Sequence, residues 1–112
     1  MTTIADLKHT IRVQRLRVTD DFYGQRKEVI EDYVLHCQIL DKGVTETDGN
    51  GHVHEIRELL FTVRSSPKTL AIVPDEYQII YKDQIYDINH VEWDTGSLRW
   101  LKIHGRRKTH AG

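Results

Sequence analysis

The chain has 112 residues, of which 38% are hydrophobic and 29% are charged, so it has room for a single domain with a modest core. Its formal net charge of −1 with neutral histidines excludes a bulk basic field of the kind that attracts nucleic acid. The single cysteine, Cys37, excludes an intramolecular disulfide, and no apolar run approaches membrane-span length. Residues 1–9 lack the apolar core of a signal peptide. We therefore expect one domain over residues 1–112, made in the cytoplasm and without a membrane partner.

The first predicted strand carries many basic residues and changes its pattern partway along. Ile11 and Val13 alternate with polar residues, whereas Leu16 and Val18 take the opposite parity. Side chains alternate between the two faces of a strand, so a change of parity indicates an extra residue or a bend. The sequence therefore predicts a β-bulge near Gln14–Arg15.

A turn at residues 20–25 leads into a predicted second strand over residues 28–40. The odd positions of this strand form its inner face, and they are Val29, Glu31, Tyr33, Leu35, Cys37 and Ile39. We expect Glu31 to pair with an arginine of the first strand or to lie where the strand leaves the core. Cys37 is expected to be a small core residue rather than a reactive thiol.

Residues 41–54 interrupt this pattern with a long, polar and glycine-bearing segment. Loops of more than about a dozen residues in a compact domain tend to be functional or disordered. The sequence therefore predicts a long loop between the second and third strands where partners are met. Its candidate residues are Asp41, Lys42, Gly43, Glu46, Asp48, Gly49, Asn50, Gly51, His52 and His54. Three acidic residues against one lysine make the segment acidic.

The second half of the chain predicts four further strands joined by short turns. These strands span residues 55–63, 77–81, 85–93 and 98–103. Six strands with tight turns indicate an all-β fold, a small antiparallel β-barrel or sandwich. Only residues 1–8 suit a short helix, and the basic segment 104–112 shows no pattern and is expected to be a tail. The side chains expected in the core include Tyr33, Leu35, Ile39, Tyr86 and Ile88.

Part of the long segment resembles the start of a calcium-binding loop. Glu46, Asp48 and Asn50 imitate the first oxygen ligands of such a loop, and Gly51 stands at its turn. The twelfth position then requires a bidentate glutamate, but that position holds Arg57. The predicted flanks are strands rather than helices. We therefore expect no calcium site.

Zinc binding and catalysis are also unsupported by the residue pattern. His52 and His54 are two residues apart and need partners such as Asp48 or Glu55, but a closed zinc site needs four ligands, often cysteines. Ser65 lacks the glycine-flanked turn of a hydrolase nucleophile. We expect no catalytic residue, no cofactor and no metal.

An oligonucleotide-binding β-barrel is the alternative from a different functional class. Arg106, Arg107 and Lys108 form a basic run, and tyrosines and tryptophans of the later strands could stack on bases. The core needs most of these aromatic residues, and acidic residues are interleaved with them. We expect the basic run to contact a protein partner or DNA.

The order of these motifs resembles the head–tail joining proteins of tailed bacteriophages, also called head completion, head closure or stopper proteins. The similar segments are "LKHTIRVQR", then "DDFYGQRKEVIEDY", then a strand with a long loop, and "DEYQIIYKDQIYDINHVEWDTGSLRWLKI". The closing pattern of the family is represented here by Ile79, Tyr81, Asp83, Tyr86 and Ile88. Asp83 replaces the usual turn glycine, which aspartate tolerates in a left-handed turn.

This resemblance implies a structural virion protein of the head–tail connector, at the capsid neck. Copies would form a homo-oligomeric ring below the portal that helps to retain packaged DNA and on which the tail docks. The implied partners are a portal or adaptor protein on the head side, a tail-terminator or tail protein on the tail side, and DNA in the channel. In this family the loop at residues 41–54 can project into the channel. A tail-terminator or tail-completion ring protein is the alternative within the same class.

Overall fold

A computed structural model describes residues 7–48, 53–93 and 99–110, with the side chains of residues 7–43, 56–93 and 99–107. Its elements in chain order are β1 (His9–Asp21), β2 (Gly24–Asp48), β3 (Val53–Arg64), α1 (Pro67–Leu70), β4 (Tyr77–Tyr81), β5 (Gln84–Trp93) and β6 (Trp100–His110). The fold is all-β, as the alternation predicts. Among the described residues, no helix is long and apolar enough to cross a membrane.

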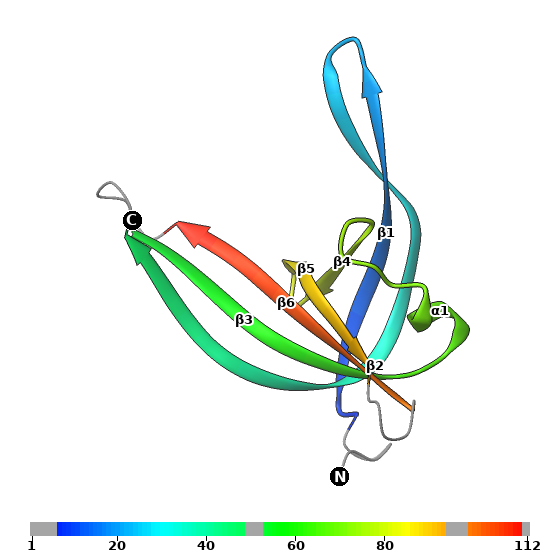
Figure 1. The fold of residues 1–112 in the computed structure, drawn as a ribbon, viewed down its shortest axis with the longest axis vertical. Coiled ribbons are helices and arrows are strands. Elements are labelled where there is room, and N and C mark those ends of the chain that lie inside the picture. Colours follow the sequence, from blue (N-terminus) through cyan, green and yellow to red (C-terminus); the bar gives the residue numbers. More distant parts are fainter. Residues whose placement is uncertain (1–6, 49–52, 94–98, 111–112) are drawn as a thin grey trace.

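The six strands form one antiparallel sheet that closes on itself in the order β1-β2-β3-β6-β5-β4 (Figure 1). Closure depends on β4, which pairs with β5 on one side and with residues 12–15 of β1 on the other. Of the two architectures that the sequence left open, the structure therefore adopts the barrel. The two-residue turn between β4 and β5 places Lys82 and Asp83 at φ 51° and 63°. Asp83 therefore takes the left-handed conformation for which the family uses glycine.

The inner side chains of all six strands form the core. The buried apolar residues are Ile11, Val13, Cys37, Leu59, Phe61, Val63, Ile72, Tyr77, Ile79, Tyr86, Ile88, Leu101 and Ile103. Tyr86 and Ile88 are buried as expected. Tyr33, Leu35 and Ile39 are only partly buried. Tyr33 and Leu35 lie where β2 has no β3 partner, because the pairing of β2 with β3 begins at Gln38.

The predicted bulge in the first hairpin is confirmed. Arg15 pairs with Glu31 and Leu16 with Val29, so Ile30 is the extra residue and the bulge lies in β2 rather than in β1. Glu31 is exposed, and its carboxylate accepts from the Arg15 guanidinium at 3.3 Å. The charged residue on the inner face is therefore explained by an arginine of the first strand.

The prediction of a long loop at residues 41–54 is wrong. The second strand continues to Asp48 and the third begins at Val53, and the two are paired from Gly43↔Glu58 to Asp48↔Val53. Lys42 is a bulged residue, after which Gly43 takes φ 100° and donates its N–H to Asp41 Oδ1 at 2.8 Å. The glycine that suggested a loop is the residue that makes a bulge possible.

The prediction of a patternless C-terminal tail is also wrong. Residues 104–110 belong to β6 and pair with β3 as far as His54↔His110. Basic residues do not interrupt a strand whose ladder partners are in place. Composition alone therefore predicted a tail where the chain forms a strand. The one helix of the described residues is α1, which was not predicted, whereas residues 1–6 of the expected helix at 1–8 lie outside the described residues. Its Ser66–Thr69 capping box and Pro67 at its start explain why the chain turns there.

Gly105 of β6 generates a first prediction, since a Cβ at this position would lie 2.7 Å from Cε2 of the buried Phe61 ring. That ring is fully enclosed and cannot move aside, so we expect Gly105→Ala to lower the free energy of unfolding by about 1–3 kcal/mol through overpacking. Urea unfolding measures this change in the free energy of unfolding, and Lys102→Ala on the exposed face of β6 is the control. Equal stability of the two variants would contradict the packing described here.

Cys37 generates a second prediction. Its side chain is fully buried, and desolvation raises the pKa of the thiol to about 12. Because the thiolate is the reactive species, iodoacetamide at pH 8 should label Cys37 only as fast as the protein unfolds. Urea-unfolded protein is the positive control. Rapid labelling of the native protein would show that this part of β2 opens locally.

Candidate functional site

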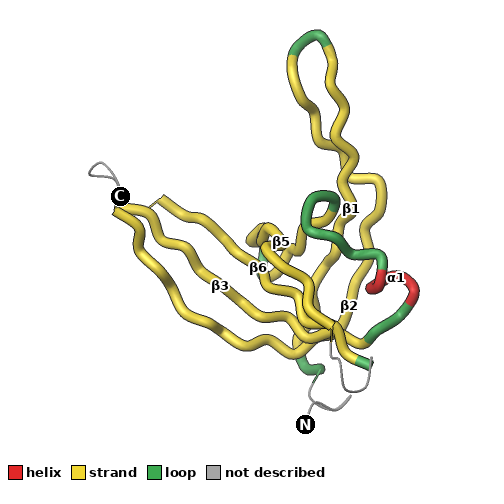
Figure 2. Tube along the Cα trace, viewed as in Figure 1, coloured by secondary structure: helices red, strands yellow, loops and turns green. Residues whose placement is uncertain are grey.

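Two strand ribbons extend beyond the closed part of the sheet (Figures 1 and 2). The first, the β1–β2 arm, consists of residues 16–29, which form ladder pairs only with each other. The second, the three-stranded extension, consists of residues 43–48, 53–58 and 106–110 of β2, β3 and β6. The radius of gyration is 15.5 Å, whereas a compact chain of this length has about 13 Å. The ribbons therefore place much of the chain away from its own core.

The tip of the β1–β2 arm exposes two aromatic side chains. Phe22 and Tyr23 are 96% and 93% exposed, and their rings contact edge to face with centroids 5.6 Å apart. The turn is held by the Tyr23 N–H, which donates to Asp21 Oδ1 at 2.8 Å, and by Gly24 at φ 113°. Exposed aromatic rings on a structured turn are typical of an interaction surface.

The arm also carries an apolar face that the chain does not cover. Ladder pairing places Leu16 beside Val29 on one face of the arm, with Val18 two residues along the same strand, and Val18 and Val29 are about half exposed. The arm extends past the end of β4, and β1 therefore has no neighbour on its other edge beyond the Leu16 N–H, which donates to Glu76 O at 2.6 Å. The apolar side chains of the arm are thus available to a partner.

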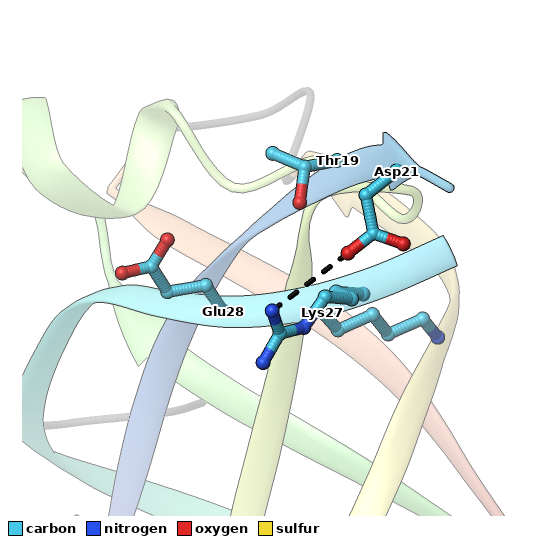
Figure 3. Close-up of a pocket in the computed structure, with 5 residues that line it drawn as sticks. Thr19, Asp21, Lys27 and Glu28 are labelled. Atoms are coloured by element: carbon cyan, nitrogen blue, oxygen red, sulfur yellow. Dashed lines mark ion pairs between the residues drawn. The ribbon is translucent and has the colours of Figure 1, made fainter. Parts of the chain in front are cut away.

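A polar hollow lies on the arm (Figure 3). Its lining residues are Thr19, Asp21, Arg26, Lys27 and Glu28. Arg26 and Asp21 form an ion pair across it at 3.7 Å, and both signs of charge are present. Exposed pairs of this kind contribute little stability, so the hollow is best regarded as a solvated surface of the arm.

The described residues that the sequence predicts for a channel loop lie on the three-stranded extension or directly before it. Asp41, Lys42, Gly43, Glu46 and Asp48 are on β2 and His54 is on β3, whereas Gly49, Asn50, Gly51 and His52 lie outside the described residues. Residues 46 and 48 are in extended ladder conformation opposite residues 55 and 53, so a calcium loop is not formed there. Within the described part of the chain, no three His, Cys, Asp or Glu side chains are grouped to hold a metal ion.

Ion pairs at the base of the extension change its predicted charge. Glu58 receives two cations, Lys42 at 3.8 Å and Arg106 at 3.4 Å, while Arg57 contacts Asp41 at 3.2 Å. A basic residue of each of β2, β3 and β6 therefore lies beside an acidic residue of β2 or β3. The extension has mixed charge, not the acidic character that residues 41–54 suggest in isolation.

A histidine adjoins this network. His104 Nδ1 lies 3.2 Å from Lys42 Nζ and its Nε2 lies 3.2 Å from Glu92 Oε2. Since lysine only donates, the contact with Lys42 requires Nδ1 to accept and Nε2–H to donate to the carboxylate. The hydrogen bond from His104 holds the pKa of Glu92 below its ordinary value.

The predicted basic run is not one cationic surface. Arg106 and Arg107 are neighbours on a strand, so their side chains leave on opposite faces. Arg106 pairs with Glu58, and Arg107 is half-buried with its Nε shielded from solvent. The side chain of Lys108 lies outside the described residues.

Two of the tyrosines proposed to stack on bases are not available, whereas Tyr81 is only partly buried and Trp93 is 43% exposed. Tyr77 and Tyr86 are buried in the core. Desolvation raises the pKa of Tyr77, as expected for a phenol removed from water. An oligonucleotide-binding barrel needs exposed stacking faces beside a basic groove, and these residues do not provide them.

The sequence analysis did not identify the β1–β2 arm as a functional element. The segment "DDFYGQ" was assigned to a turn between two strands, which is correct. The available signal was the pair of adjacent aromatic residues in that turn, because aromatic side chains in turns are seldom needed for the turn itself.

Comparisons with known proteins identify the chain's relatives. A family model described as phage head completion protein matches residues 2–108. A solved chain described as "Virion of native gene transfer agent (GTA) particle" has a similar fold, with a TM-score of 0.75 over 94% of this chain and 97% of that chain. Their sequences are 15% identical, so this likeness shows the fold alone. No curated protein sequence matches the chain significantly.

The exposure of the arm tip generates a third prediction. Replacing Phe22 and Tyr23 together by alanine removes no buried contact, so the free energy of unfolding should change by less than about 0.5 kcal/mol. Phe61→Ala in the core is the reference and should cost about 3–5 kcal/mol. A loss above about 1 kcal/mol in the double variant would show that the rings stabilise the isolated subunit.

Proposed function

Because this chain belongs to the phage head completion protein family, we propose that it is a structural subunit of the joint between the capsid and the tail. Copies form a ring below the portal at the capsid neck. The ring meets a portal or adaptor protein on the head side and a tail-terminator or tail protein on the tail side. It helps to retain the packaged DNA and offers the tail its docking surface. The match over residues 2–108 is the observation that carries this proposal.

The geometry of the subunit supports assembly rather than independent action. Two ribbons leave the core, and one of them exposes apolar side chains that the chain itself does not cover. A chain with 38% hydrophobic residues has few to spare, and exposed apolar groups on an arm are typical of subunits that complete their burial against neighbours. Burial in an assembly offsets the free energy of exposing them.

The three-stranded extension is the part of the subunit that we place toward the channel. It contains residues 43–48 and 53–54 of the segment 41–54 that the family resemblance assigns to this role, and these residues are paired in a ribbon. Its mixed charge suits a lining past which DNA slides, because paired acidic and basic groups neither attract nor repel phosphates strongly over distance. A ladder of hydrogen bonds gives such a lining a fixed shape.

The test shortens the extension without changing its faces. Removing residues 45–48 together with residues 53–56 leaves Val44 opposite Arg57 and deletes an even number of residues from each strand, so the inner and outer faces are retained. We expect the purified variant to stay folded, with a circular dichroism spectrum of β type and cooperative melting. In phage, the particles should package DNA but lose it or fail to bind tails, as measured by nuclease sensitivity and negative-stain images.

A phage that lacks the whole protein is the reference for this experiment. Its heads should leak DNA and carry no tails. Full infectivity of the shortened variant would show that the extension is not needed for closure of the channel. It would not contradict the position of the subunit in the neck. Tailed, DNA-filled particles without the protein would contradict the proposed function itself.

A further inference from the structure

The barrel wall carries a second exposed apolar feature, a row that crosses four strands. Ladder pairing places Val34 of β2 next to Arg12 of β1, Arg12 next to Ile80 of β4, and Ile80 next to Ile85 of β5. Their strand neighbours Tyr33, Val13, Ile79 and Tyr86 face the core, so all four side chains point outward. Val34 and Ile85 are 59% and 53% exposed. We call Val34, Ile80 and Ile85 the outer row.

The outer row lies beside a polar row of the same sheet. The Arg12 guanidinium is drawn away to Asp32, so the aliphatic stem of Arg12 lies between the three apolar residues. The next row of the sheet is polar and hydrogen-bonded, with Gln78 donating to Gln14 at 2.8 Å and Gln14 donating to Asp32 at 3.3 Å. An aromatic ring with a hydroxyl at its end fits such a boundary.

The arm tip of the same chain cannot reach this row. Tyr23 directly precedes β2, on which Val34 lies, and about 11 residues of mostly extended chain separate the two by roughly 36 Å. The arm is held straight by its own ladder from Leu16↔Val29 to Asp21↔Gly24, so it projects away from the wall (Figure 1). An arm tip that covers an outer row must therefore belong to another copy.

We propose that the Phe22–Tyr23 tip of one copy docks on the outer row of a second copy of this chain. Phe22 covers the apolar side chains, and the Tyr23 hydroxyl meets the polar row beside them. The two aromatic side chains bury about 150–250 Å² each. Together they supply about half of the roughly 800 Å² per partner that a stable protein interface needs.

This contact joins two different patches, so it is heterologous and repeats from copy to copy. Such contacts generate closed rings when the rotation between copies closes. The inference rests on the proposed ring, because it names the contact by which neighbouring subunits of that ring hold each other.

Cysteine cross-linking in purified particles tests the contact. Tyr23→Cys combined with Ile85→Cys should give a ladder of disulfide-linked multimers of this chain on oxidation. The buried Cys37 contributes no background, because its thiol is enclosed. Tyr23→Cys combined with Val73→Cys is the matched control, since Val73 is similarly exposed but lies outside the outer row. This control should give a cross-link yield lower by about tenfold or more.

A charge pair provides an independent readout. Tyr23→Lys or Ile85→Asp alone should lower incorporation of the chain into particles by about tenfold, the effect expected from losing a buried aromatic anchor. The two changes together should restore much of that loss, because every contact then joins a lysine to an aspartate. A purely structural effect of either change would not be rescued by the other.

The outcomes separate this inference from the proposed function. If the chain is present in particles, three results would overturn the arm contact and leave the neck role intact. These are equal cross-linking of both cysteine pairs, no cross-linking, and cross-linking to a different virion protein only. Absence of the chain from purified particles would overturn the proposed function and this inference with it. A ladder specific to the Ile85 pair, with rescue by the charge pair, supports the contact.

Discussion

The pairing of the five-residue strand β4 with residues 12–15 of β1 determines the shape of the subunit. This short ladder closes the sheet and brings Tyr77 and Ile79 into the core beside Val13. Because β4 is short and β1 and β2 are long, only part of each long strand can belong to the closed wall. The remainder must leave it as a ribbon.

The two ribbons have different chemistry because different neighbours accompany them. The three-stranded extension keeps β6 as a third strand, and cations of β6 and β2 meet the carboxylate of Glu58 there. The β1–β2 arm has only two strands, so its apolar face and its aromatic tip have no cover. The first ribbon is therefore suited to a polar channel, and the second to an apolar contact with a protein surface.

Close packing in the wall sets what the subunit tolerates. The Phe61 ring of β3 contacts Tyr81 of β4 and Tyr86 of β5 edge to face, and Gly105 lets β6 pass over the Phe61 ring. Aromatic pairs of this kind contribute beyond the area that they bury. The small core thus depends on a few large rings, which is how a highly charged chain can still fold and leave apolar residues for a partner.

Much of this fold follows from the sequence alone. Alternating side chains predicted six strands, because alternation is a local property of an extended chain. A bulge was predicted near Arg15 of the first strand and lies opposite it in the second, and an arginine partner was one of two expectations for Glu31. The sequence also carried the family resemblance, through motifs whose order spans nearly the whole chain. It misassigned residues 41–54 and 104–110, since polar and glycine-bearing composition does not reveal that a ladder partner is present.

Only the tertiary structure decided which side chains share a surface. Register across four strands brings Val34, Ile80 and Ile85 together although about 50 residues separate the first from the last. The same register shows that Arg106 is paired with Glu58 and that Phe22 and Tyr23 have no cover. Local sequence shows, where alternation is clear, which residues form a strand and which way their side chains alternate. Strand pairing, which is non-local, determines what lies beside it and hence which residues are left for a partner.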